Sequence, residues 1–192
     1  MQLLDNKAFF LLINSYAKKS VVLDTIMVSI AQYTPYFFIA LLFYLWFSKR
    51  KNEALYAGYA ATLGIIINWL IGLFYFHNRP FMDHIGVSLL SHKAENSFPS
   101  DHTTFVVSIA FMLLTFSSTR VIGIIATIVA LGCGIARVYC GVHYPFDIIG
   151  SLMVAIFAVV AIKYFEKRVK VLNRYIIFLW NTTIQKSRNE KN

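Results

Sequence analysis

The chain has few of the residues that build a disulfide-linked or highly charged soluble protein. Among its 192 residues only 9 are acidic, 4 are proline and 2 are cysteine. The cysteines, Cys133 and Cys140, have no CxxC spacing, and on one helix they would lie about 10 Å apart, too far for a disulfide. A disulfide scaffold is therefore excluded, and the scarcity of proline and acidic residues leaves room for long uninterrupted helices.

The residues that are present are mostly apolar and come in long runs. Hydrophobic residues make up 58% of the chain, and its mean hydropathy of +0.61 is well above that of soluble proteins. Because a helix needs about 20 apolar residues to cross a bilayer, the runs predict an all-α protein, a polytopic transmembrane helical bundle of five or six spans. The runs cover approximately 21–47, 54–76, 103–117, 121–136 and 146–162.

The first run leaves two interpretations open. Pro35 disfavours a helical conformation at Thr34. The run is therefore either one kinked helix or a short half-helix followed by a full one.

Both ends of the chain have amphipathic character. A helical face within residues 1–19 predicts an N-terminal interfacial helix, since it carries Leu4, Ala8, Leu11, Leu12 and Tyr16. Residues 166–192 form a basic tail that is expected on the anionic cytoplasmic leaflet. With no repeat or low-complexity linker between these ends, residues 1–192 are predicted to form a single integral membrane domain.

The formal net charge of +9 is distributed unevenly along the chain. Basic residues cluster at 49–51 and from Lys163 onward, whereas the loops at 77–102 and 137–145 contain only Arg79, Lys93 and Arg137. By the positive-inside rule the basic side is cytoplasmic, so these two loops face outward. The charge is thus a signal of membrane topology and not of nucleic-acid binding.

Three ionisable residues lie between two apolar runs at the spacing R-x5-H-x3-D: Arg137, His143 and Asp147. Ionisable groups at a membrane boundary are costly and so indicate a functional site. Pro145 can begin a helix, which would place Asp147 in the first turn, where it accepts a hydrogen bond from His143 and leaves the other imidazole nitrogen free as a nucleophile. The alternative is an aspartate that stabilises a helix N-terminus beside an interfacial histidine.

Two clusters upstream complete a set suited to phosphate chemistry. Arg79 and Arg137 together would form a clamp for phosphate oxygens. The P-S-D-H segment at 99–102 is expected to open a helix, with Ser100 as N-cap, backbone amides that bind phosphate, and His102 as a proton donor to a leaving oxygen. Each cluster alone fits a capped helix or a snorkelling arginine, but their order on one membrane face favours catalysis.

The remaining histidines, His77, His84 and His92, lie in the same outward loops. Since polar residues gather in loops, we interpret these three as ordinary loop residues.

The three clusters resemble the signature of the type 2 phosphatidic acid phosphatase superfamily, K-x6-R-P, P-S-G-H and S-R-x5-H-x3-D. The contexts at 76–81, 97–104 and 143–147 are similar to those of the bacitracin-resistance type of undecaprenyl-diphosphatase. The resemblance implies a multi-pass bacterial cell-membrane enzyme without metal or other cofactor. It would hydrolyse undecaprenyl diphosphate to undecaprenyl phosphate and inorganic phosphate through a phosphohistidine, which recycles the cell-wall lipid carrier and confers bacitracin tolerance.

The resemblance also implies residue roles. The catalytic residues would be the nucleophile His143, the general acid His102 and the orienting Asp147. The substrate-binding residues would be Arg79, Arg137, Pro99, Ser100 and Asp101.

Three positions depart from the family pattern. Gly72 replaces its lysine, Asp101 its glycine and Ala136 its serine. The first two departures are compatible with the diphosphatase subgroup, and Lys93 is a candidate for the missing positive charge.

Three alternatives compete with this interpretation. The same chemistry could act on another lipid phosphate, such as phosphatidylglycerophosphate, phosphatidate or a shorter isoprenyl diphosphate. The site could hold a metal through His102, His143, Asp101 and Asp147, although two nearby arginines disfavour a cation. The chain could also be a non-catalytic lipid-binding or transport protein with a degenerate site.

Overall fold

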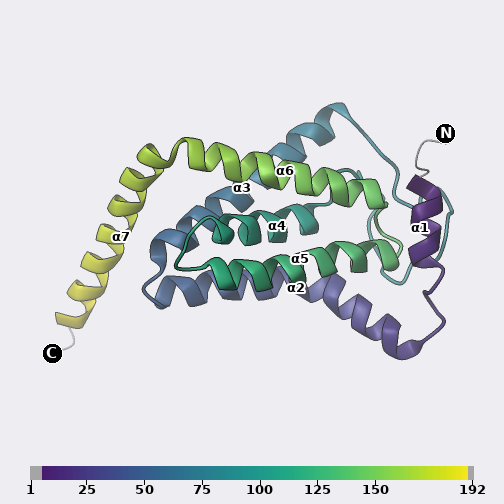
Figure 1. Ribbon diagram of the computed structural model, residues 1–192, viewed down its shortest axis with the longest axis horizontal. Helices are drawn as coiled ribbons and strands as arrows, with labels where there is room; N and C mark the ends of the chain where they lie inside the picture. The colour runs from purple at the N-terminus through teal and green to yellow at the C-terminus, as the bar shows by residue number, and fades with distance from the viewer. Residues whose placement is uncertain (1–5, 190–192) are drawn as a thin grey trace.

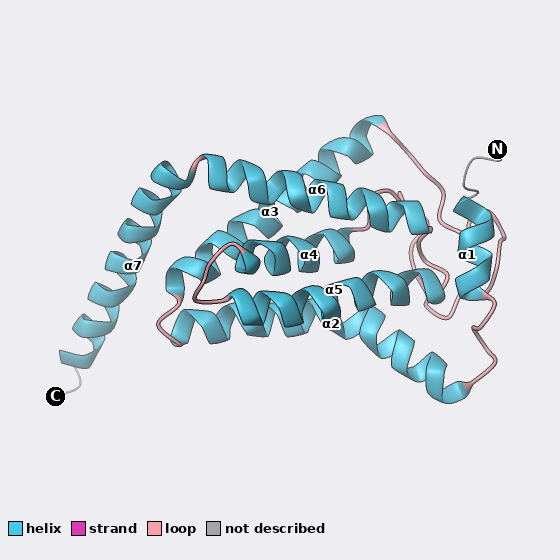
Figure 2. Cartoon of the chain, in the orientation of Figure 1, coloured by secondary structure: helices cyan, strands magenta, loops and turns pink. Residues whose placement is uncertain are grey.

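The computed structural model describes residues 6–189, with side chains described to residue 183, and this part of the chain is helical (Figures 1 and 2). The predicted all-α class is confirmed. The predictions for residues 1–5 and 190–192 lie outside the described residues. The helices are α1 (Asn6–Asn14), α2 (Val21–Phe47), α3 (Lys51–Phe74), α4 (Asp101–Leu114), α5 (Arg120–Tyr139), α6 (Pro145–Tyr164) and α7 (Glu166–Asn189).

Four of these helices, α2, α3, α5 and α6, are long and apolar enough to cross a membrane. The fifth apolar run forms α4, which at 14 residues extends about 21 Å and falls short of the hydrocarbon thickness. Helix α4 can be short because it lies at the centre of the bundle, packed against α2, α3, α5 and α6. The predicted bundle therefore consists of four long helices around a short central one.

The first span is a single helix. Helix α2 runs through Pro35 and bends along its length (Figure 1). The proline lacks the N–H that a helix interior needs, and beside it the Thr34 hydroxyl donates to the Ile30 carbonyl at 2.7 Å. Of the two interpretations left open by the sequence, the kinked helix is correct.

Helix α1 lies across the end of the bundle where the α3–α4 and α5–α6 connections meet (Figure 1). Its Phe10 is fully buried, with its ring 5.4 Å from that of Tyr144. The buried Asn14 amide donates to the carbonyls of Val87 and Tyr139, both at 2.8 Å. One face of α1 thus fixes these two connections. Leu11 and Leu12 of α1, and Tyr16 in the turn that follows it, stay exposed, which suits a helix at a membrane surface.

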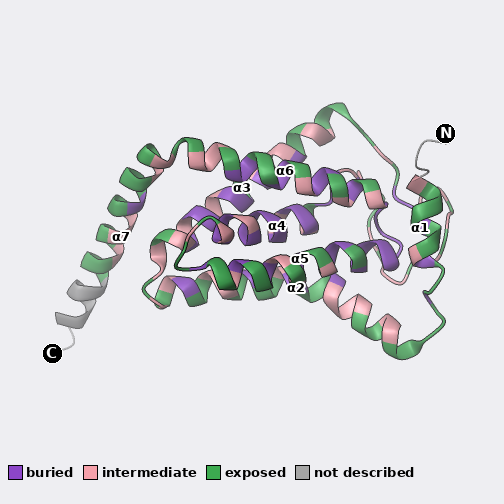
Figure 3. Ribbon diagram, in the orientation of Figure 1, coloured by how far each residue is buried: buried purple, intermediate pink, exposed green. Residues whose placement is uncertain are grey.

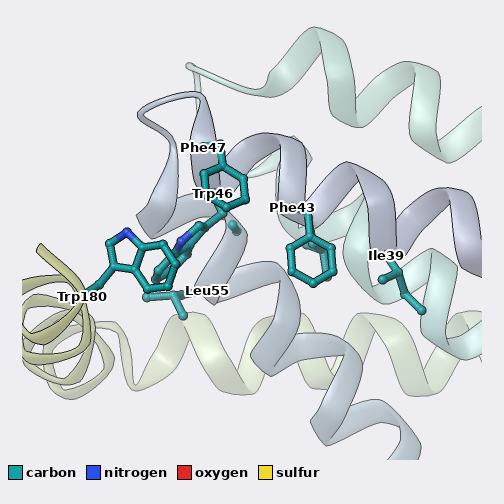
Figure 4. Close-up of a pocket in the computed structure, with 8 residues that line it drawn as sticks. Ile39, Phe43, Trp46, Phe47, Leu55 and Trp180 are labelled. Atoms are coloured by element: carbon teal, nitrogen blue, oxygen red, sulfur yellow. The ribbon is translucent and has the colours of Figure 1, made fainter. Parts of the chain in front are cut away.

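At the opposite end, α7 projects away from the bundle (Figure 1). Trp180 attaches it, packing edge-on against Trp46 of α2 with ring centroids 5.3 Å apart. Both rings line an apolar cavity of about 440 Å³ that also includes Phe47 and Leu55 (Figure 4). Helix α7 is therefore held to α2 and α3 far from the end that α1 covers.

The outward faces of the long helices are exposed while the inner faces are buried (Figure 3). Many exposed side chains are large and apolar, among them Phe43, Val121 and Phe157. Such a surface is unsuited to water and suits contact with lipid. The burial pattern therefore agrees with a multi-pass membrane protein.

Candidate active site

The connection between α5 and α6 places a histidine inside the protein. Gly141 has a φ of +78°, which glycine adopts without strain, and it turns the chain after α5. His143 follows, only 1% exposed, and α6 begins at Pro145 as the sequence predicts. The Tyr144 amide donates to Asp147 Oδ2 at 2.8 Å. This turn brings His143 Nδ1 to 3.3 Å from the same oxygen, which confirms the predicted pairing.

Asp147 is completely buried, and polar groups surround its carboxylate. Besides His143 and the Tyr144 amide, the Ser97 hydroxyl donates to Oδ2. The other oxygen, Oδ1, lies 3.3 Å from Nδ1 of His77. A buried charge persists when it is paired and hydrogen-bonded, so these contacts allow Asp147 to act as an ionised acceptor.

The second ring nitrogen of His143 faces two arginines. Nε2 lies 3.1 Å from Arg79 Nη1 and 3.4 Å from Arg137 Nη2. Because a guanidinium only donates, we assign Nε2 as the acceptor and Nδ1 as the protonated nitrogen. Burial, followed by the charges of the two arginines, lowers the pKa of His143 to about 3 against the opposing effect of Asp147. The imidazole is therefore neutral, with a lone pair on Nε2, as a nucleophile requires.

Arg79 is fixed by the backbone. It is buried, and it donates to the carbonyls of Glu95 at 3.2 Å, Asn96 at 3.1 Å and Val142 at 3.0 Å. Burial lowers the pKa of Arg79, although arginine remains charged at physiological pH. These bonds tie the α3–α4 loop to the α5–α6 connection and hold the guanidinium against His143.

Arg137 keeps an unused donor. It is 2% exposed, and its Nη2 lies 3.3 Å from His92 Nε2 as well as near His143. Its Nε is buried with no hydrogen-bond partner in the described part of the chain. A buried charged donor without a partner is costly, and an anionic oxygen would satisfy it. Together the two arginines present positive charge around one nucleophilic nitrogen.

The N-terminus of α4 completes the site. Ser100 is its N-cap, as predicted, and its hydroxyl accepts from the Thr103 amide. Asp101 is exposed, and its Oδ1 accepts from the Asn68 amide at 2.8 Å. His102 follows in the first turn and is half-buried, and burial, followed by the charges of Arg137, His92 and Arg79, lowers its pKa to about 4.

Two cavities meet at this helix start. One of about 430 Å³ includes Arg79, Gly72, Pro99 and Asp101 in its lining. The other, of about 260 Å³, is lined by apolar side chains together with Asp101 and His102. Ile65 and Asp101 belong to both linings. A polar cavity beside Arg79 thus adjoins an apolar one beside His102.

The structure brings most of the predicted site residues together, adds two histidines to the site and leaves Lys93 and Ala136 outside it. His84 is an exposed loop residue, as expected, whereas that interpretation is wrong for His77 and His92, which contact Asp147 and Arg137. Lys93 is exposed, and within the described residues no hydrogen bond or ion pair of its side chain connects it to the site. Ala136 lies in a buried apolar cluster formed with Ala17, Ala31, Tyr139 and Cys140.

Sequence reasoning missed several contributors because they have no motif of their own. Ser97 contacts both Asp147 and His143, and Glu95 lies 3.6 Å from Arg79 Nη2. For Ser97 the one available signal was its position in the S-F-P-S-D-H-T-T stretch. The metal-site alternative gains no geometric support, because no group of three or more His, Cys, Asp or Glu in the described residues is arranged to hold an ion.

Known proteins share this architecture. The PAP2 superfamily profile matches residues 53–170. Undecaprenyl-diphosphatase BcrC of Bacillus subtilis is 39% identical over 154 residues, 79% of each chain. Putative undecaprenyl-diphosphatase YbjG of Escherichia coli is 31% identical over 119 residues, 60% of this chain and 58% of that one. The crystal structure of Aquifex aeolicus LpxE superposes with a TM-score of 0.73 at 26% identity, covering 85% of this chain and 97% of that one.

The matched segment contains all three motifs, from Arg79 to Asp147, and most of the helices around them. The likeness therefore covers the site and its scaffold together. By sequence and by fold, the chain belongs to the PAP2 superfamily.

Proposed function

We propose that this protein is a membrane phosphatase that hydrolyses undecaprenyl diphosphate to undecaprenyl phosphate and inorganic phosphate. The observation that carries the proposal is the environment of His143. Its Nε2 lies within 3.4 Å of two buried guanidiniums while Nδ1 faces a buried carboxylate. This arrangement suits in-line attack on a phosphorus whose oxygens the arginines hold. The relatives named undecaprenyl-diphosphatase support the choice of substrate.

In the first step the Nε2 lone pair of His143 attacks the terminal phosphorus, and the bond from phosphorus to the bridging oxygen breaks. The negative charge of the bound diphosphate favours the protonated form of His102. His102 gives its proton to that oxygen, so undecaprenyl phosphate leaves and the phosphoryl group stays on His143. Asp147, hydrogen-bonded to Nδ1, stabilises the positive charge that the phosphorylated ring acquires. Arg79 and Arg137 offset the charge on the equatorial oxygens.

In the second step water attacks the phosphohistidine. His102, now deprotonated, accepts a proton from the water as its oxygen bonds to phosphorus. The phosphorus–nitrogen bond breaks, the electron pair returns to Nε2, and inorganic phosphate is released. His102 ends the cycle protonated and His143 neutral, so the enzyme is regenerated.

The two cavities give the lipid a place. The diphosphate would occupy the polar cavity beside Arg79, which Pro99 and Asp101 also line, next to the α4 N-cap Ser100. The isoprenyl chain would pass into the apolar cavity, whose lining includes Pro35, Ile39 and Phe105. His102 lines this second cavity, next to the position of the leaving oxygen. The general acid then stands between headgroup and tail, where proton donation is required.

The remaining features of the proposal follow from charge. Two arginines supply the positive charge that a metal would otherwise provide, so the reaction is metal-independent. The basic segments face the cytoplasm, which puts the site on the extracytoplasmic side. Removing the diphosphate there consumes the target of bacitracin and confers tolerance. Residues 1–192 act as one membrane domain.

The test is to trap the intermediate. Purified protein is mixed with undecaprenyl diphosphate labelled in its terminal phosphate, quenched within milliseconds and separated from lipid. We expect a protein-bound phosphate that is labile in acid and stable in base, as a phosphorus–nitrogen bond is. His143→Gln should carry none, whereas the matched change His84→Gln in the exposed loop should carry as much as wild type. Label on His143→Gln would contradict the proposed nucleophile.

A further inference from the structure

The two oxygens of Asp147 have different partners. Oδ2 serves His143, Ser97 and the Tyr144 amide. Oδ1 has one side-chain partner in the described part of the chain, His77 Nδ1 at 3.3 Å. Since Asp147 is 0% exposed, an unpaired Oδ1 would be costly. His77 therefore completes the hydrogen bonding of the carboxylate that orients the nucleophile.

His77 is held in place and yet reaches solvent. Its ring stacks on Tyr75 with centroids 6.2 Å apart and contacts Tyr144 at 5.2 Å. Its amide donates to Asn96 Oδ1 at 2.8 Å. The side chain is 31% exposed and lines a cavity of about 470 Å³ together with Asp147. Unlike buried His143, this histidine is therefore accessible to water.

From this geometry we infer that His77 is a positioning residue, which shares the Asp147 carboxylate with His143 and sets the acid limit of the reaction. The inference rests on the proposed phosphohistidine mechanism. When His77 is neutral, its Nδ1–H hydrogen bond steadies Asp147, and the carboxylate's charge is available to His143. When His77 is protonated, it forms an ion pair with Asp147 and draws that charge away from the nucleophile.

The charged groups around His77 set the direction of the pH dependence. The hydrogen bond that His77 donates to Asp147 of α6 raises the pKa of His77 above its ordinary value. Asp83 of the loop adds to this effect, and burial and Lys7 of α1 oppose it. The ion pair is therefore fully formed below about pH 6.5, the ordinary histidine pKa, and is lost as pH rises through the raised value. Turnover should fall as pH drops through that range and recover above it.

Exchange for asparagine separates titration from hydrogen bonding. His77→Asn keeps a donor near the position of Nδ1 but cannot be protonated. We expect its kcat at pH 8 to stay within about threefold of wild type, and the acid limb of its kcat profile to move at least about one pH unit lower. The matched control His84→Asn, an exposed residue of the same loop whose positive φ asparagine tolerates, should leave the limb unmoved. A limb that stays in place in His77→Asn would overturn the inference.

His77→Phe provides the complementary change, since it keeps a ring beside Tyr75 and Tyr144 but removes the donor to Oδ1. Its kcat should fall by about tenfold or more across the whole pH range, with unchanged KM because the ring does not contact substrate. A His77→Phe variant with wild-type kcat would also overturn the inference.

A spectroscopic measurement tests the shared carboxylate without turnover. In histidine-selective ¹⁵N NMR of the full chain in micelles, His77 should show a protonated Nδ1 and a pKa above the ordinary histidine value. Asp147→Asn should lower the pKa of His77, because it removes the negative charge that the ring faces. If Asp147→Asn left the pKa of His77 unchanged, the inference would be overturned even though wild type is active. If wild type hydrolyses no lipid phosphate but Asp147→Asn lowers the pKa of His77, the proposed mechanism is wrong while the sharing of Asp147 by the two histidines is supported.

Discussion

At the residue scale, the site is organised around one buried carboxylate. Asp147 accepts hydrogen bonds from Ser97 and the Tyr144 amide, and it contacts both His143 and His77. Ser97 is fully buried, and its hydroxyl also lies 3.3 Å from His143 Nδ1. The hydroxyl thus holds the carboxylate in the position from which it orients the nucleophile. Its contribution should appear in kcat, because Ser97 does not line the cavity assigned to the phosphate.

Ser97→Ala should therefore lower kcat by about tenfold to a hundredfold, the range expected for a hydrogen bond to a charged group, with little change in KM. Steady-state kinetics in detergent would measure both parameters. The control is Ser91→Ala, an exposed serine in the same loop, which should behave as wild type. A rise in KM with unchanged kcat would indicate that Ser97 binds substrate and does not position Asp147.

Spacing along the chain predicted the contact between His143 and Asp147 but gave no sign of the contacts made by His77 and Ser97. His143 and Asp147 lie four positions apart, so helix geometry alone pairs them once Pro145 begins the helix. His77 reaches Asp147 across 70 positions and Ser97 reaches His143 across 46. Contacts of that kind depend on how two loops close over the helix ends, and no periodicity encodes them. The missing partners are therefore those that only tertiary structure brings together.

At the element scale, apolar runs predicted the helices well, and close packing explains the rest. Helix α3 approaches α4 at Gly64, where a Cβ would lie 2.9 Å from Ser108 Oγ. Such contacts let α4 sit inside the bundle, where a helix need not match the bilayer thickness. The sequence could not show this, because a short apolar run looks the same in a core as in a membrane.

Trp180 of α7 contacts both Trp46 and Phe47 of α2, so Trp180→Ala tests the attachment of this helix. The Trp46–Trp180 pair should contribute about 1 kcal/mol beyond the area it buries, and its loss should lower the thermal unfolding midpoint in detergent. Because this contact lies far from His143, activity per folded molecule should not change. Phe178→Ala, which removes an exposed ring from the same helix, should leave the midpoint nearly unaltered. An unchanged midpoint in Trp180→Ala would show that other contacts hold α7.

At the scale of the whole molecule, the candidate active site and most of the basic residues lie at opposite ends of the bundle. The α3–α4 and α5–α6 connections meet under α1 at one end, and α7 leaves from the other (Figure 1). Basic residues cluster at 49–51 and from Lys163 onward, toward the α7 end, whereas the other end has the arginines of the site together with Lys7, Lys18, Lys19 and Lys93. By the positive-inside rule we expect His143 to face the outside of the cell.

Cysteine labelling in intact cells would test this orientation. The native Cys133 and Cys140 are buried, so the background should be low. A membrane-impermeant maleimide should label Ser91→Cys in the exposed α3–α4 loop and spare Ser117→Cys in the exposed α4–α5 connection. After cells are broken, both positions should react. Labelling of Ser117→Cys alone in intact cells would show that the opposite orientation is correct.

The most direct test of the central proposal is phosphate release from undecaprenyl diphosphate by purified protein in detergent containing EDTA. His143→Ala is measured beside wild type, with folding checked by circular dichroism, and with phosphatidate and phosphatidylglycerophosphate as competing substrates. We predict wild-type turnover that EDTA does not reduce, preference for the undecaprenyl lipid, and a loss of about a thousandfold or more in the variant. A folded His143→Ala protein with wild-type activity, or wild-type activity that requires a metal ion, would contradict the proposed mechanism.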